Sequence, residues 1–110
     1  MTATDGLWIE TTDGQLIRAD TITALQVVDG NYKRQRADST LHAGDLILRA
    51  FTGSHDGKAT YHHLAGEISQ LGDAFTALRL LVRTLGEEAG RPAVIISYDA
   101  KVNSWRTQLP

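Results

Sequence analysis

The chain has 110 residues, a formal net charge of −2 at pH 7 and no cysteine. A chain of this length is expected to form a single domain, residues 1–110, that buries a substantial core. The lack of cysteine excludes disulfides, thiol catalysis and cysteine-ligated zinc. The slightly acidic balance gives no overall attraction to nucleic acid or to anionic membranes. No apolar run approaches membrane-spanning length, so we expect a cytoplasmic protein with no membrane partner.

Two short segments of alternating apolar and polar residues, 7–11 and 15–19, predict a β-hairpin at the start of the chain. The Asp-Gly pair between them is a turn signal. A three-residue loop with its glycine in the left-handed conformation pairs Ile9 with Ile17 and places the apolar side chains on one face. A two-residue turn mixes the faces, so we prefer the longer loop. Residues 22–28 predict a third strand, with apolar residues on both sides.

The middle of the chain combines a polar stretch with a second hairpin. Residues 32–44 predict a long loop, or a polar edge strand followed by a loop, and long loops in compact domains are often functional. Residues 46–52 and 58–64 predict two strands joined by a turn at 53–57. This second hairpin leads directly into the longest periodic segment of the chain.

That periodic segment predicts the one long helix of the protein, over about residues 67–89. Its apolar residues recur at alternating steps of four and three positions, which places them on one helix face. They are Leu64, Ile68, Leu71, Phe75, Leu78, Val82, Leu85 and Ala89. Gly90 and Pro92 supply the stop signal, because glycine takes the left-handed cap conformation and proline cannot continue the helix.

The segment after the helix predicts a C-terminal β-hairpin. Residues 93–98 are the most strand-like run of the chain, and residues 105–109 return antiparallel to them, with Tyr98 opposite Trp105. The predicted fold class is therefore α+β. It comprises a mostly antiparallel sheet of about six or seven short strands, one long amphipathic helix packed on one face, and a closing hairpin.

The leading functional hypothesis is a non-enzymatic binding or regulatory module that self-associates as a homodimer or binds another protein. The apolar stripe of the helix is wider than one sheet face needs, and Leu80 lies nearly opposite Leu78. We therefore predict an outer helix face of Ala77, Leu80 and Thr84 as a contact surface. An exposed sheet edge is the other candidate, because unpaired edge strands invite partners.

A weak nucleic-acid-binding domain is the alternative hypothesis. Tyr32 stands beside Lys33, Arg34 and Arg36, and arginines contact phosphates while a tyrosine can stack on a base. Three basic residues in a loop are a weak signal in a slightly acidic chain.

No catalytic, cofactor-binding or metal-binding residues are predicted, and the sequence leans away from an enzyme. His62 and His63 are adjacent on a predicted strand and point to opposite faces, so they cannot both bind one ion without a bulge. Ser54, His55 and Asp56 are neighbours in a turn and do not converge as a catalytic triad must.

A third hypothesis is a small enzyme or a small-molecule-binding fold. Its pocket would lie between the helix and the sheet, near Trp8, His63 and Tyr98. The Asp-Gly turns of the chain do not follow a strand and open a helix, so they are not phosphate-binding loops.

Overall fold

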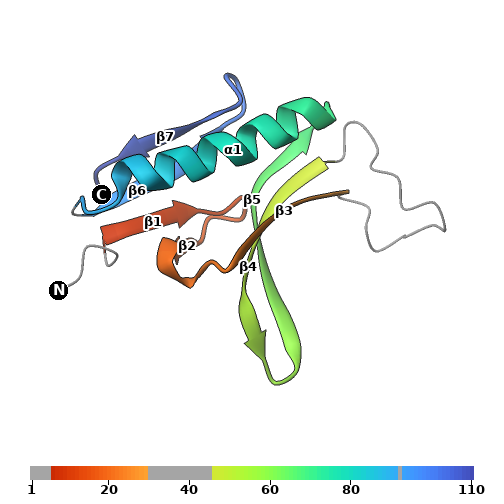
Figure 1. The fold of residues 1–110 in the computed structure, drawn as a ribbon, viewed down its shortest axis with the longest axis vertical. Coiled ribbons are helices and arrows are strands. Elements are labelled where there is room, and N and C mark those ends of the chain that lie inside the picture. The colour runs from red at the N-terminus through yellow and green to blue at the C-terminus, as the bar shows by residue number, and fades with distance from the viewer. Residues whose placement is uncertain (1–5, 30–45, 92) are drawn as a thin grey trace.

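The computed structural model describes residues 6–29, 46–91 and 93–110. In these residues one α-helix packs against two β-sheets, and a β-hairpin follows it (Figure 1). This arrangement confirms the predicted α+β class. The helices and strands are β1 (Leu7–Glu10), β2 (Leu16–Arg18), the 3₁₀ helix η2 (Ala19–Thr21), β3 (Ala24–Asp29), β4 (Leu46–His55), β5 (Lys58–Ile68), α1 (Leu71–Glu88), β6 (Val94–Asp99) and β7 (Ser104–Gln108).

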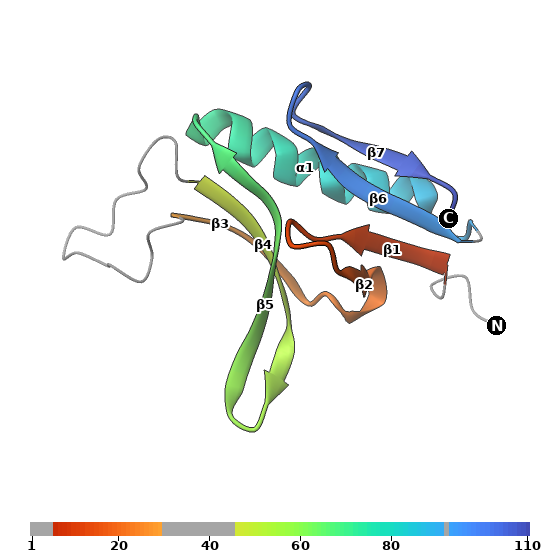
Figure 2. The same ribbon diagram turned by 180° about the vertical axis from the view of Figure 1, so that it is seen from behind.

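The first sheet has the strand order β2-β1-β6-β7. β1 and β6 run parallel, with Ile9 beside Ile96, and the other pairs are antiparallel. The view from behind shows β6 and β7 passing in front of α1, so the helix lies against the opposite face of these strands (Figure 2). The parallel pair brings the first strand of the chain against the strand that follows the helix.

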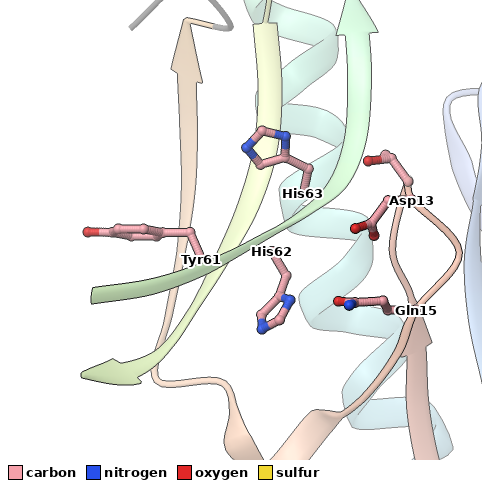
Figure 3. Close-up of a pocket in the computed structure, with 6 residues that line it drawn as sticks. Asp13, Gln15, Tyr61, His62 and His63 are labelled. Atoms are coloured by element: carbon pink, nitrogen blue, oxygen red, sulfur yellow. The ribbon is translucent and has the colours of Figure 1, made fainter. Parts of the chain in front are cut away.

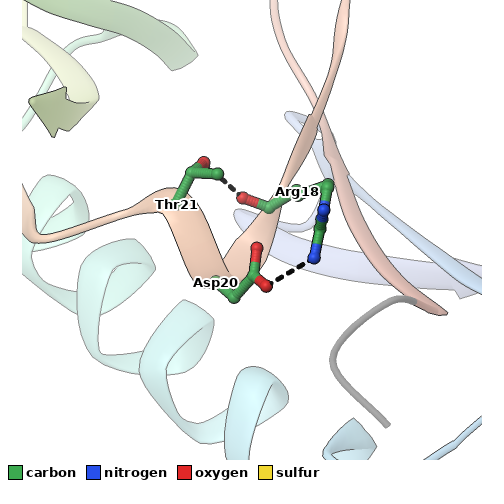
Figure 4. A network of polar contacts seen from close by, with 3 residues as sticks. All are labelled: Arg18, Asp20 and Thr21. Carbon is green, nitrogen blue, oxygen red and sulfur yellow. Dashed lines mark hydrogen bonds and ion pairs between the residues drawn. The ribbon is translucent and has the colours of Figure 1, made fainter. Parts of the chain in front are cut away.

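The β1–β2 hairpin has the predicted register, with Ile9 opposite Ile17. Its loop has three residues, and Gly14 takes a φ of +87°. The Thr11 amide donates to the Gln15 carbonyl at 2.8 Å, which closes the loop. β2 then leads into η2, where polar contacts among Arg18, Asp20 and Thr21 hold the turn (Figure 4).

The second sheet has the order β3-β4-β5, and all its pairs are antiparallel. Its longer hairpin contradicts the predicted five-residue turn at 53–57. β4 runs to His55, and only Asp56 and Gly57 turn the chain, with φ of 52° and 77°. Gly53, at a φ of 114°, lies inside the strand at a register shift, so the glycine permits an irregularity there and does not end the strand.

The helix begins later than the apolar periodicity predicts. Leu64 and Ile68 belong to β5 and are buried there, and α1 starts at Leu71. Their spacing of four positions fits one face of a helix and equally one face of a strand, so the periodicity alone does not distinguish the two. α1 ends at Glu88, and Gly90 has the expected positive φ.

The buried face of α1 also differs from the predicted stripe. Ala74, Ala77 and Leu81 are fully buried, whereas much of the predicted stripe stays exposed. Small side chains at the contact let the helix backbone approach the strands closely. Leu78 and Leu85 lie at the boundary and are partly buried against the core.

The C-terminal hairpin attaches to α1 through specific hydrogen bonds. Tyr98 pairs with Trp105 as predicted, with ring centroids 5.2 Å apart. The Trp105 indole Nε1 donates to the Ala77 carbonyl at 2.8 Å, and the Asn103 side-chain amide donates to the Asp73 carbonyl at 3.0 Å. These bonds orient one flank of the helix towards β7.

Candidate binding surfaces

An exposed apolar stripe runs along α1. Leu71, Phe75 and Val82 are 45%, 42% and 54% exposed. Their spacing of four and seven residues places them on one flank of the helix. Trp105 and Asn103 bond to the roughly opposite flank, so the stripe lies away from β7. Large apolar side chains gathered on one exposed flank are typical of an interaction surface.

The strand β3 contacts this helix and forms one edge of its sheet as the described residues define it. It pairs with β4 along all six of its residues with no register shift, and within the described residues no strand pairs with its other side. The segment Ala24–Val28 contains no charged residue and no proline. Leu25 and Val27 pack against the core and remain only partly buried. Natural proteins usually protect such edges with charges, bulges or prolines, and the segment Ala24–Val28 has none of these.

The other described edges carry such protection. β2 is only three residues long and contains Arg18. β7 contains Arg106, whose Nε lies 3.8 Å from an Asp99 carboxylate oxygen. β5 has irregular register, and the Thr12 amide donates to the His63 carbonyl at 2.8 Å from the neighbouring sheet. β3 is therefore the described edge best suited to a strand from a partner.

A ring cluster lies on the face of the β3-β4-β5 sheet that points away from the core. The Arg49 guanidinium carbon lies 3.8 Å from the centroid of the Tyr61 ring, and Tyr61 lies 5.3 Å from Phe51 by ring centroids. Arg49 Nε donates to the Gln26 side-chain oxygen at 2.9 Å. His63 is opposite Arg49 on the neighbouring strand. Planar groups arranged in this way can stack on flat ligands.

A polar pocket of about 310 Å³ separates the β1–β2 loop from β5 (Figure 3). Its lining residues are Thr12, Asp13, Gln15, Tyr61, His62 and His63. The Thr11 hydroxyl donates to Asp13 Oδ1, and this bond is the main cause that lowers the pKa of the Asp13 carboxyl. The pocket thus combines a stabilised carboxylate with two imidazoles on an open surface.

The histidines of this pocket do not assemble a recognisable metal centre. In the described residues, no three His, Cys, Asp or Glu side chains lie close enough to hold a metal ion together. His62 and His63 are consecutive in β5, and their rings lie apart in the close-up (Figure 3). His55 is at the hairpin tip, where its Nε2 lies 3.4 Å from an Asp56 carboxylate oxygen.

The structure places the predicted outer helix residues differently from the sequence analysis. Ala77 is fully buried, and its carbonyl accepts the Trp105 bond, so it cannot belong to an outer face. Leu80 packs partly against the core, and the Thr84 hydroxyl donates to the Leu80 carbonyl at 2.8 Å. Leu71, Phe75 and Val82 belong to the apolar face that the periodicity predicts, but the structure leaves them exposed and does not bury them in the core.

The structure does not bring the other predicted groups into one site. Trp8 is on β1 beside Ile95, whereas Tyr98 packs on Trp105 at the helix side of the sheet. Neither lines the pocket that contains His63. The nucleic-acid candidates Tyr32, Lys33, Arg34 and Arg36 lie outside the described residues. Sequence reasoning missed the ring cluster, although the alternation of Arg49 with Phe51 and of Tyr61 with His63 marks one face of two strands.

No family model, curated protein or solved structure matches this chain. None of the helices in the described part of the chain is long and apolar enough to cross a membrane. Function must therefore be inferred from the surfaces themselves.

Proposed function

We propose that this protein is a small non-enzymatic binding module that self-associates through α1 and β3. The contact surface, called the α1–β3 surface below, consists of Leu71, Phe75 and Val82 together with the outer edge of Ala24–Val28. α1 and β3 contact each other in the fold, so a partner can meet both elements at once. The observation that carries the proposal is a strand edge that no described strand covers, on an element that contacts a helix with exposed apolar side chains.

Burial of the stripe supplies a favourable free energy of association. Complete burial of a Leu, Phe or Val side chain contributes about 1.5–3 kcal/mol, and these side chains are already about half covered. Two copies of the stripe therefore contribute several kcal/mol, which is comparable with the lower estimates for lost translational and rotational freedom. Backbone hydrogen bonds along β3 add directional contacts. The expected complex is a reversible dimer whose population depends on protein concentration.

The test is light scattering after size-exclusion chromatography across a range of protein concentrations. Val82→Glu would place a charge in the middle of the contact and shift the population from dimer to monomer. Thr76→Glu is the matched control, because it adds the same charge to an exposed position of the same helix outside the stripe. Far-UV circular dichroism should show both variants folded. A wild-type protein that stays monomeric at every concentration would show the proposal to be wrong.

Binding of single-stranded nucleic acid is the second candidate function, favoured by the ring cluster of Arg49, Phe51 and Tyr61. Bases stack on aromatic and guanidinium planes with little sequence preference. Tyr61→Ala should weaken the binding of a fluorescein-labelled oligonucleotide at low salt, measured by anisotropy, whereas Arg106→Ala on the other sheet should not. A combined alanine variant of Lys33, Arg34 and Arg36 should reduce the salt dependence. No binding by the wild-type protein at low salt would exclude this function.

A further inference from the structure

We infer that β3 strands from two copies of the chain pair antiparallel and join the two three-stranded sheets into one six-stranded sheet. This inference rests on the proposed self-association and specifies its geometry. In the inferred register, Gln26 faces Gln26 of the partner subunit. Leu25 then faces Val27 of the partner subunit, and Ala24 faces Val28 of the partner subunit.

The direction follows from the two faces of β3. Leu25 and Val27 point to the α1 side of the sheet, and Ala24, Gln26 and Val28 point to the other side. Most homodimers are related by a two-fold axis, which makes the same patch face itself. With the axis perpendicular to the sheet, the strands are antiparallel and both α1 helices lie on the same face. A two-fold axis along the strands would place the two helices on opposite faces and leave each stripe uncovered.

The register follows from burial and charge. Directly opposite residues in an antiparallel pair point to the same face, so Leu25 must face a residue of the same face. Pairing Leu25 with Val27 of the partner subunit covers two side chains that are only partly buried in the single copy. Asp29 is the only charged residue of β3. This register places the two Asp29 side chains at opposite ends of the paired β3 strands. No like charges therefore face each other between the two paired β3 strands.

The absence of native cysteine allows a direct test with single-cysteine variants. Facing residues of an antiparallel pair have Cα atoms about 4.5–5.5 Å apart, and disulfides form at Cα separations of about 4.4–6.8 Å. Gln26→Cys should therefore cross-link two copies under mild oxidation. Ala24→Cys is the control on the same strand and face. In the inferred register its two copies lie four residues, or about 14 Å, apart along the strands.

Two further variants test the register and the choice of edge. A mixture of Ala24→Cys and Val28→Cys should give a disulfide between the two variants that neither variant forms alone, because these positions face each other in the paired β3 strands. Gln108→Cys places the thiol on the edge strand β7, and it should remain reduced. Non-reducing electrophoresis over time measures each cross-linking rate, and we expect Gln26→Cys to react at least about tenfold faster than Ala24→Cys or Gln108→Cys alone.

The outcomes separate this inference from the proposal on which it rests. A wild-type dimer with slow cross-linking of both Gln26→Cys and the mixed variants would retain self-association and overturn β3 pairing. Equal rates for Gln26→Cys and Ala24→Cys would overturn the register. A wild-type protein that is monomeric by light scattering would overturn both the pairing and the proposed function. Gln26 is exposed, so loss of its bond to Arg49 should leave the fold intact, which circular dichroism checks.

Discussion

Replacing Ala77 with leucine tests which face of α1 packs on the strands. Ala77 has no exposed surface, and its carbonyl accepts the hydrogen bond from the Trp105 indole at 2.8 Å. A leucine side chain adds three carbon atoms at a contact where the helix approaches β7 closely. The helix and the hairpin must separate to admit it, which strains both the packing and the hydrogen bond.

Overpacking of this kind typically lowers the free energy of unfolding by about 1–3 kcal/mol. With a urea dependence of about 1.5 kcal/mol per molar for a domain of this size, the unfolding midpoint should fall by about 0.7–2 M. Urea titration followed by far-UV circular dichroism measures the midpoint. Thr76→Leu is the control, since that neighbouring position is exposed and the change should shift stability by no more than about 0.5 kcal/mol.

An unchanged midpoint for Ala77→Leu would refute the packing of α1 described above. If that variant instead increased self-association without loss of stability, Ala77 would belong to the outer contact face that the sequence analysis predicted. A loss of stability with unchanged self-association would support the observed orientation of the helix.

Two more substitutions probe the contacts that hold the loops and the hairpin. Trp105→Phe removes the indole N–H and part of a buried ring, so the free energy of unfolding should fall by about 2 kcal/mol in the same urea assay. Thr11→Val removes the hydroxyl that lowers the pKa of Asp13, and an NMR titration should show that pKa rise towards its ordinary value. Because the pKa of Asp13 is lowered in the folded state, the stabilisation from this bond is present at neutral pH and should be lost as the pH falls through that pKa. An equal difference in the free energy of unfolding between wild type and variant at neutral and acidic pH would contradict this reasoning.

Local sequence patterns were sufficient for the hairpins at both ends of the chain. The register of Ile9 with Ile17 follows from alternation together with a glycine that can adopt a positive φ. The pairing of Tyr98 with Trp105 follows from the same alternation across a short loop. Such features depend on neighbouring residues, because strand period and turn geometry are decided within a few positions.

The bounds of β5 and α1 could not be predicted in this way. Leu64 and Ile68 continue the helical spacing of the following segment, yet both are buried in a strand. Ile68 pairs with Leu46, a residue distant in sequence, and this long-range pairing overrides the local periodicity. The ring cluster of Arg49 and Tyr61 was missed for a related reason, since it depends on how β4 and β5 align.

The short strands and the one amphipathic helix follow from the hydrophobic period and the turn residues, which are local properties of the chain. The rotation of α1 about its axis is different, because it depends on contacts with strands that are distant in sequence. The helix carries a row of large apolar residues at Leu71, Phe75 and Val82 and a neighbouring row that contains Ala74, Ala77 and Leu81. Periodicity allows either row to face the strands. The row that contains the two alanines packs inward, since the alanine side chains permit close approach and the Trp105 bond, while Leu81 is buried in the core. The row of Leu71, Phe75 and Val82 is left exposed as a candidate surface for a partner.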